Sequence, residues 1–150
     1  MRQVLKACPC IVKNNYILAF EHPDGGYQLP KGTVEDEESV EAAVLRELEE
    51  ESGISTAKII ERVGEMDWYV EAGTTTYTVG EHQQWHIYLL DAGKDLPENW
   101  SHAATGSDVE EGQIFKYFWQ SLDQISERFH PVYRQVLEMV SEHISRNTSL

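Results

Sequence analysis

Four glutamates and an arginine stand together in residues 46–51, which read RELEEE. On an α-helix, which turns by about 100° per residue, Glu47, Glu50 and Glu51 fall within about 100° of arc. Carboxylates on one helical face repel each other, so this arrangement favours a bound cation. Carboxylate oxygens are hard ligands that suit Mg²⁺ or Mn²⁺, and such a metal can polarise a phosphoryl oxygen and activate water. The alternative is a solvated acidic helix.

A short loop before this run could approach a ligand. Residues 29–32 read Leu-Pro-Lys-Gly, and Gly32 would let the backbone come close to a ligand or metal. Lys31 could offer positive charge to a phosphate, and an exposed loop lysine is the alternative interpretation. Ser39 is a plausible N-cap and Gly53 a natural residue after the last turn, so together they delimit a helix.

This helix must bury one face to hold the glutamates in place. Val40, Val44, Leu45 and Leu48 form an apolar stripe at helical spacing, and we expect all four in the core. Glu49 falls away from this stripe and is predicted to face solvent.

The remaining segments supply the framework. Strands are expected at 4–12, 16–20, 58–63, 65–70, 75–79, 85–90 and 114–119, with a short extended piece at 27–29. Residues 91–112 read as a long loop, 121–125 as a helical turn and 131–144 as a helix with Val132, Val136, Met139 and Val140 inward. Strands alternating with two helices predict one domain over residues 1–150, built as a mixed sheet covered by helices.

Composition limits the class of protein. The 150 residues are 41% hydrophobic and 25% charged, which is typical of a soluble globular chain. No run of about 18 apolar residues exists, and the N-terminus lacks a signal-peptide core, so we expect a cytoplasmic protein without a membrane span. The net charge of −14, from 26 acidic and 12 basic residues, argues against a broad nucleic-acid footprint. A small phosphorylated ligand stays compatible, because bound metal inverts the local field.

The two cysteines, Cys8 and Cys10, lie two positions apart in an expected strand and therefore share a face. A disulfide framework would need more cysteines, and the spacing matches no zinc pattern. We interpret them as two small buried residues.

The central stretch resembles the signature of the Nudix hydrolases. That signature is Gly, five residues, Glu, seven residues, Arg-Glu, an apolar residue, any residue, Glu-Glu, any residue, Gly and an apolar residue. The matching positions are Gly32, Glu38, Arg46, Glu47, Leu48, Glu50, Glu51, Gly53 and Ile54, without a departure.

The resemblance implies an α/β fold, a Nudix-like α/β/α sandwich with a mixed β-sheet, and Mg²⁺-dependent hydrolysis of a pyrophosphate bond. It implies that Glu47, Glu50 and Glu51 bind the cation, that one of them acts as the base, and that a backbone carbonyl of Lys31 or Gly32 joins the metal shell.

The same resemblance gives two further residues supporting roles. Arg46 would orient Glu47, and Glu38 would pair with Arg46 to hold the loop against the helix.

Other candidates lie outside the signature. Some similar proteins carry a further acidic ligand near a late strand, where this chain has Phe118. Nearby substitutes are Asp108, Glu110 and Glu111, for which loop solvation is the alternative. Base stacking could come from Trp68, Tyr69, Tyr77 and Trp85, unless these are core or surface aromatics. His82 and His86 flank Trp85 and are more typical of structural hydrogen bonding.

The expected partner is a small nucleotide: a nucleoside di- or triphosphate or a dinucleoside polyphosphate. We do not expect a nucleic acid or a membrane partner, and a homodimer stays open. The alternatives are an RNA 5′-end pyrophosphohydrolase and a non-catalytic, ligand-sensing Nudix-like module.

Overall fold

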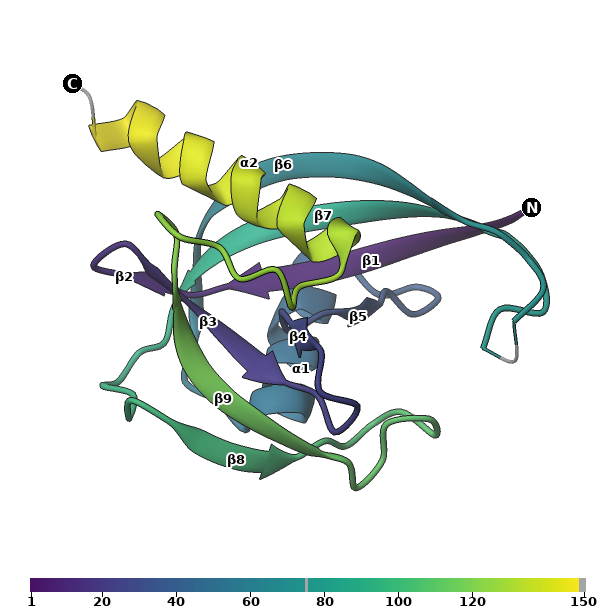
Figure 1. Cartoon of the computed structure of the whole chain (residues 1–150), viewed down its shortest axis with the longest axis horizontal. Helices are drawn as coiled ribbons and strands as arrows, with labels where there is room; N and C mark the ends of the chain where they lie inside the picture. Colours follow the sequence, from purple (N-terminus) through teal and green to yellow (C-terminus); the bar gives the residue numbers. More distant parts are fainter. Residues whose placement is uncertain (75, 149–150) are drawn as a thin grey trace.

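The computed structural model describes residues 1–74 and 76–148. Within them the chain forms the elements shown in Figure 1. In chain order these are β1 (Arg2–Cys10), β2 (Val12–Lys13), β3 (Tyr16–Glu21), β4 (Tyr27–Gln28), β5 (Gly32–Thr33), α1 (Val40–Ser52), β6 (Lys58–Val70), β7 (Glu81–Asp91), β8 (Trp100–Ala103), β9 (Ile114–Ser121) and α2 (Pro131–Thr148). None of the helices in the described ranges is long and apolar enough to span a membrane.

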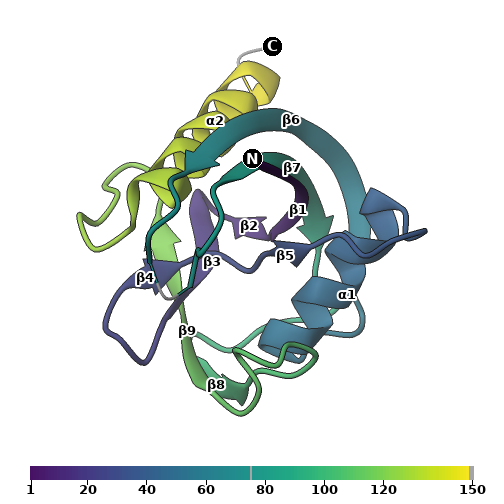
Figure 2. The same ribbon diagram turned by 90° about the vertical axis from the view of Figure 1, so that its right-hand side faces the viewer.

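The strands form two sheets. One has the order β5-β1-β7-β6, in which β1 and β7 run parallel and the outer pairs run antiparallel. The other has the order β2-β3-β9-β8, with β4 paired to β3, and all its pairs are antiparallel. Figure 2 shows the strands curving between α1 and α2, which lie on opposite sides. The mixed pairing confirms the expected fold class.

Successive strand residues point to opposite faces and so fill two cores. The core under α2 includes Cys8, Cys10, Ile17, Ala19, Ile87, Leu89, Val136, Leu137 and Val140. The core under α1 includes Ala7, Ile11, Leu18, Phe20, Tyr88, Leu90, Ala43, Val44 and Leu48. Each central strand therefore contributes to both cores, and the arrangement is helix, strands, helix.

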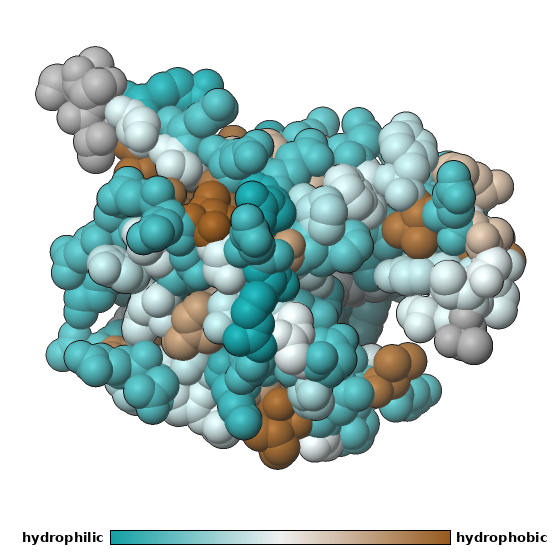
Figure 3. Space-filling model, in the orientation of Figure 1, coloured by the Kyte–Doolittle hydropathy of each residue, from teal (hydrophilic) through white to brown (hydrophobic). Residues whose placement is uncertain are grey.

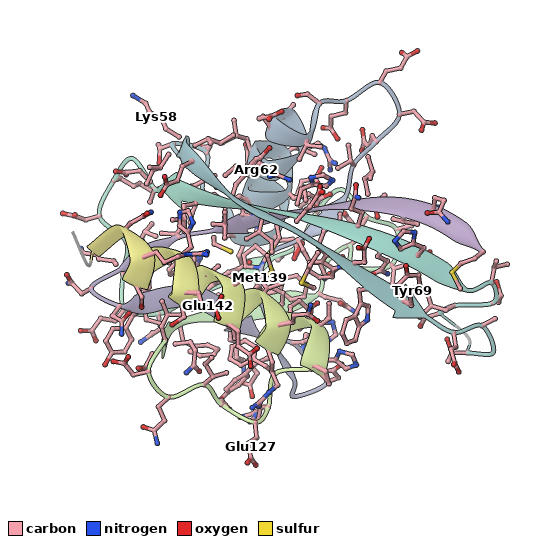
Figure 4. All side chains as sticks on the ribbon, turned by 90° about the horizontal axis from the view of Figure 1, so that it is seen from above. Lys58, Arg62, Tyr69, Glu127, Met139 and Glu142 are labelled. Carbon is pink, nitrogen blue, oxygen red and sulfur yellow. The ribbon has the colours of Figure 1, made fainter. Side chains whose placement is uncertain are left out.

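The expectations for α2 and the cysteines are confirmed. Val132, Val136 and Val140 are buried, and Met139 is partly buried against the same core. Figure 4 shows Met139 between α2 and β6. Cys8 and Cys10 are both buried on one strand face, with their Sγ atoms 4.0 Å apart and no disulfide between them.

Two strand predictions were wrong around β6. The predicted pair 58–63 and 65–70 is one strand that passes through Gly64, because register shifts near Glu61 and Gly64 absorb the irregularity. Residues 76–79 form no strand, and residue 75 lies outside the described residues. The Tyr77 N–H donates to Thr74 Oγ1 at 2.8 Å, so this segment bonds to itself rather than to a neighbouring strand.

Two connections also differ from expectation. The predicted loop 91–112 contains β8, which pairs with β9. The ring of Trp100 on β8 stacks on that of Tyr117 on β9, with the ring centroids 4.9 Å apart. That pairing is long-range, so local composition did not reveal it. The predicted helical turn 121–125 is a non-helical bend, in which the Gln120 side chain donates to the carbonyl of Gln124.

Leu45 was wrongly placed in the core. It is 38% exposed, whereas Val44 and Leu48 are fully buried and Val40 is partly buried. The buried face of α1 is rotated away from Leu45 and toward Glu47, as the next section describes.

Candidate active site

Helix α1 carries the glutamates, and capping residues define where it begins and ends. Ser39 Oγ accepts the Ala42 N–H at 3.1 Å and caps the helix start. Gly53 ends the helix at φ 82°, and its N–H donates to the Glu49 carbonyl at 2.8 Å. Glu49 is exposed, as predicted.

Glu47 is buried against the loop that contains Gly32. Glu47 is only 8% exposed to solvent. A Cβ atom added at Gly32 would lie 1.9 Å from the Glu47 carboxyl carbon, so only glycine leaves room for this carboxylate. Glycine at position 32 therefore serves a close approach between loop and helix.

Arg46 ties the same loop to the helix. Its Nε and Nη2 donate to the two carboxylate oxygens of Glu38 at 2.8 and 3.0 Å, a bidentate pair. Its Nη1 donates to Glu47 Oε1 at 2.8 Å and to Glu50 Oε2 at 3.1 Å, and Nη2 also reaches the Thr33 carbonyl at 3.0 Å. One guanidinium thus positions three carboxylates.

Glu51 is the most buried of the acidic groups in α1, at 2% exposure. Its Oε2 accepts the Lys31 backbone N–H at 3.3 Å. Its Oε1 is buried without a hydrogen-bond partner among residues 1–74 and 76–148. Burial raises the pKa of Glu51 well above its usual value, although the nearby Lys31 ammonium opposes this. A buried carboxylate oxygen without a partner points to a missing positive ligand.

The pKa of Glu47 is also raised. Burial raises the pKa of Glu47 to about 7, against the opposing effect of Arg46.

Glu50 is less buried, and its backbone carbonyl accepts the Thr105 N–H at 3.0 Å. A Cβ atom at Gly106 would lie 2.2 Å from the Glu50 carboxyl carbon, so the segment before β9 closes over this side chain.

The donor set fits a hard divalent cation. Among residues 1–74 and 76–148, no group of three or more acidic, histidine or cysteine side chains is arranged to hold a metal ion as it stands. The available donors are nevertheless carboxylate oxygens beside the loop that contains Lys31 and Gly32, and Glu51 Oε1 has no partner among the described residues. Glu47, Glu50 and Glu51, with a carbonyl of Lys31 or Gly32, would therefore be the residues that hold it.

Lys31 is not an exposed loop lysine. Its side chain is 17% exposed, and Nζ lies 3.3 Å from Gln28 Oε1 and 3.9 Å from Glu110 Oε2. Burial alone would lower the pKa of Lys31, but Tyr133, Glu51 and Glu110 outweigh it and raise that pKa. The Lys31 ammonium group is thus held at the boundary of the acidic site.

The three late acidic residues behave differently. Glu110 faces Lys31, Glu111 accepts the Gly106 N–H at 3.0 Å, and Asp108 is exposed. Phe118 packs against the core under α2, with its ring tilted toward that of Tyr27 and the ring centroids 4.6 Å apart. Of these positions, Glu110 is therefore the one whose side chain reaches the site.

Sequence reasoning missed Tyr117. Its hydroxyl is buried, and no residue in the described part of the chain forms a hydrogen bond with it. Burial raises the pKa of Tyr117, and the nearby Glu51 and Glu110 raise it further. The strand alternation of 114–121 could have placed Tyr117 on the α1 face, but nothing local indicated the acidic neighbours.

A cleft of about 820 Å³ opens beside Lys31. Figure 3 shows the surface indented on this face, between the body and the protruding residues 71–74 and 76–80. Its lining brings together the four residues considered for base stacking, namely Trp68, Tyr69, Tyr77 and Trp85. Trp85 is only 3% exposed and belongs mainly to the core.

His82 and His86 lie apart from the cleft lining, on the α1 face of β7. The His82 ring nitrogens are 2.6 Å from Gln3 Oε1 and 2.7 Å from Asp67 Oδ1. The His86 Nε2 is 3.1 Å from Gln84 Oε1. Both imidazoles therefore make structural hydrogen bonds.

The chain is similar to known proteins in sequence and in fold. The NUDIX domain model matches residues 6–140. The RNA pyrophosphohydrolase of Wolbachia sp. subsp. Brugia malayi (strain TRS) is 30% identical over 129 residues, which cover 81% of this chain and 75% of that protein. The MutT Nudix hydrolase of Burkholderia pseudomallei superposes with a TM-score of 0.62 at 26% identity, covering 93% of this chain and 99% of that one. The MutT protein of Methanosarcina mazei Go1 gives a TM-score of 0.66 at 19% identity, with 99% and 97% coverage. The chain therefore belongs to the Nudix hydrolase family and is a pyrophosphohydrolase of the Nudix type.

Proposed function

We propose that residues 1–150 form one Nudix domain that hydrolyses a pyrophosphate bond in a nucleoside di- or triphosphate or a dinucleoside polyphosphate. The preferred cation is Mg²⁺, with Mn²⁺ as an alternative. The observation that carries the proposal is the buried, partnerless Oε1 of Glu51, which lies beside Glu47 and next to an aromatic cleft. An acidic cation site adjoining a base-sized cleft suits a polyphosphate attached to a nucleoside.

Each residue has a defined task in this proposal. The cation, held by Glu47, Glu50 and Glu51, would polarise the phosphoryl oxygens and offset their charge. Arg46 fixes the orientation of Glu47, and Lys31 holds a phosphate oxygen at the mouth of the cleft. A water oxygen forms the new bond to phosphorus, the bridging P–O bond breaks, and one glutamate accepts the water proton. Which glutamate does so stays open.

A second candidate is an RNA 5′-end pyrophosphohydrolase. The Wolbachia relative at 30% identity bears that name, which favours it. The net charge of −14 disfavours a long nucleic-acid track, but a 5′ end needs cations only at its phosphates. A non-catalytic sensing module is disfavoured by the intact signature. The cytoplasmic location and a homodimer stay predictions.

A substrate panel tests the proposal. The purified protein is incubated with Mg²⁺ and nucleoside di- and triphosphates, dinucleoside polyphosphates, nucleotide sugars, capped RNA or 5′-triphosphorylated RNA, and products are identified by mass. Metal-dependent cleavage of a small nucleotide supports the main proposal. Pyrophosphate release from RNA alone supports the second candidate. Absence of cleavage across the panel contradicts both.

A further inference from the structure

Lys6 is a second cation at the boundary between the acidic site and the cleft. It lies on β1 directly opposite Thr33 of β5, one residue after Gly32. Its Nζ donates to Thr33 Oγ1 at 3.0 Å, which fixes the ammonium group over the loop that faces Glu47. The side chain also lines the cleft, so a ligand there can reach it. The chemistry proposed above gives this residue no task.

Lys6 and Lys31 form a pair of like charges. Burial lowers the pKa of Lys6, and the neighbouring Lys31 lowers it further. The carboxylates of Glu81, Glu47 and Glu110 act on Lys6 in the opposite direction. Both ammonium groups line one cleft, in a protein of net charge −14. An anion bound between them would relieve their repulsion.

Beyond the lysines, aromatic rings and a hydrogen-bonded amide line the cleft. Trp68 and His130 meet edge to face, with ring centroids 6.1 Å apart, and both line the cleft. On the floor, the Trp85 indole N–H donates to Gln83 Oε1 at 2.9 Å, and Gln83 Nε2 donates to Glu81 Oε1 at 2.9 Å. These bonds fix which end of the Gln83 amide is donor and which is acceptor.

The groups therefore follow one order: carboxylates on α1, then Lys31 and Lys6, then aromatic rings and an oriented amide. The same order occurs in a nucleotide, in which the metal-bound phosphate is followed by the nucleoside-bearing phosphate and then the base. Charge-assisted bonds suit the middle position, and ring stacking suits the last.

We propose that Lys6 is a phosphate-binding residue that, together with Lys31, holds the nucleoside-bearing phosphate of the substrate and directs the base into the cleft beside Trp68. This inference rests on the proposed pyrophosphohydrolase function. It makes Lys6 a determinant of substrate affinity rather than of the chemical step.

The test compares Lys6→Gln with the charge-preserving Lys6→Arg and with Lys13→Gln. Lys13 is an exposed lysine on β2 and lines a different cavity. Binding of methylenediphosphonate in Mg²⁺ is measured by calorimetry, since its P–C–P bridge resists hydrolysis. Loss of one charge-assisted contact should weaken binding by about tenfold or more in Lys6→Gln. Lys6→Arg should retain most affinity, and Lys13→Gln should match wild type.

Steady-state kinetics on the best nucleotide from the substrate panel complete the test. The proposal predicts a KM about tenfold higher for Lys6→Gln, with kcat within threefold. Wild-type failure to bind methylenediphosphonate, unchanged binding in Lys6→Gln, or a collapse of kcat at constant KM would each overturn it. Such results with nucleotide cleavage intact leave the proposed function standing, whereas a wild-type protein that cleaves nothing removes that function.

Discussion

Two cavities of nearly equal size lie at opposite ends of the β1-β7-β6 strands. One, of about 820 Å³, meets Lys6, Trp68 and Gln83 and opens beside Lys31. The other, of about 850 Å³, meets Lys13, Ile60 and Leu90, at the far ends of the same strands. Size therefore does not separate a substrate cleft from a surface hollow.

What separates the two cavities is how their polar groups are satisfied. At the far cavity, Asp91 Oδ1 accepts the Gly93 N–H at 2.7 Å, and the Trp119 indole donates to the Pro97 carbonyl at 3.1 Å. Behind Lys31, which lines the other cleft, Glu51 Oε2 accepts the Lys31 backbone N–H, and Glu51 Oε1 is buried without a hydrogen-bond partner among the described residues. A buried oxygen without a partner costs stability, so this carboxylate marks the Lys31 side as the place where a ligand would complete the structure.

The largest effect is expected for Glu51→Gln. Replacing a carboxylate that we propose to bind the metal should lower kcat/KM by at least about 100-fold, while Glu98→Gln, which changes a carboxylate at the far cavity, should stay within twofold. Steady-state kinetics on the best panel substrate measure both. Similar losses in the two variants would erase the distinction between the cavities.

Gly32→Ala comes next. The added methyl would overlap the Glu47 carboxyl group, so this carboxylate or the loop must move from its place. A displacement of about 1 Å should cost about 100-fold in kcat/KM. The matched control is Gly64→Ala, whose methyl meets only the flexible Met139 Cε at 3.3 Å. Full activity in Gly32→Ala would show that the close contact is dispensable.

Stability should depend on pH through Glu47. Its pKa is about 7 in the folded chain and about 4.5 when unfolded, so the folded state binds the extra proton between these values. Its contribution is present below pH 4.5 and is lost as pH rises through 7, by at most about 3 kcal/mol. Burial raises the pKa of Glu51 too, so it acts in the same direction.

Urea unfolding at pH 4.5 to 7.5 measures this effect in chelator and in saturating Mg²⁺. The metal-free protein should lose stability as pH rises, Glu47→Gln should lose less, and Mg²⁺ should stabilise most at the upper end. A metal-free stability that rises across this window would contradict the assignment.

Arg46→Lys should have the smallest effect of these. Lysine cannot make the bidentate pair with Glu38 while also reaching Glu47, so the carboxylates lose their fixed orientation. We expect about a tenfold loss in kcat/KM. Arg62→Lys serves as the control, because Arg62 pairs with Glu65 on an exposed surface. Equal losses would mean that Arg46 has no special positioning role.

The acidic site was predictable because it lies in one continuous segment. The helix period alone placed Glu47, Glu50 and Glu51 on one face, and the Nudix resemblance supplied the partner loop. The edge of the buried face was predicted wrongly at Leu45, which is exposed. Contacts with the strands decide which face of α1 is buried, and helical spacing alone does not reveal those contacts.

The cleft was predictable only as separate residues. Trp68, Tyr77 and Trp85 were candidates individually, but β6, β7 and the segment between them had to fold before they met. Lys6 and Tyr117 gave no local signal, because their neighbours come from β5 and α1. Strand β8 was missed for the same reason, as only its pairing with β9 defines it.

The central claim is that the α1 glutamates bind the divalent cation that the reaction requires. Electron paramagnetic resonance of Mn²⁺ counts free and bound ions directly, without activity. The account predicts saturable binding by wild-type protein, competition by Mg²⁺, and affinity at least about 100-fold weaker in the combined Glu47→Gln, Glu50→Gln and Glu51→Gln variant. Wild-type affinity in that folded triple variant would contradict the account.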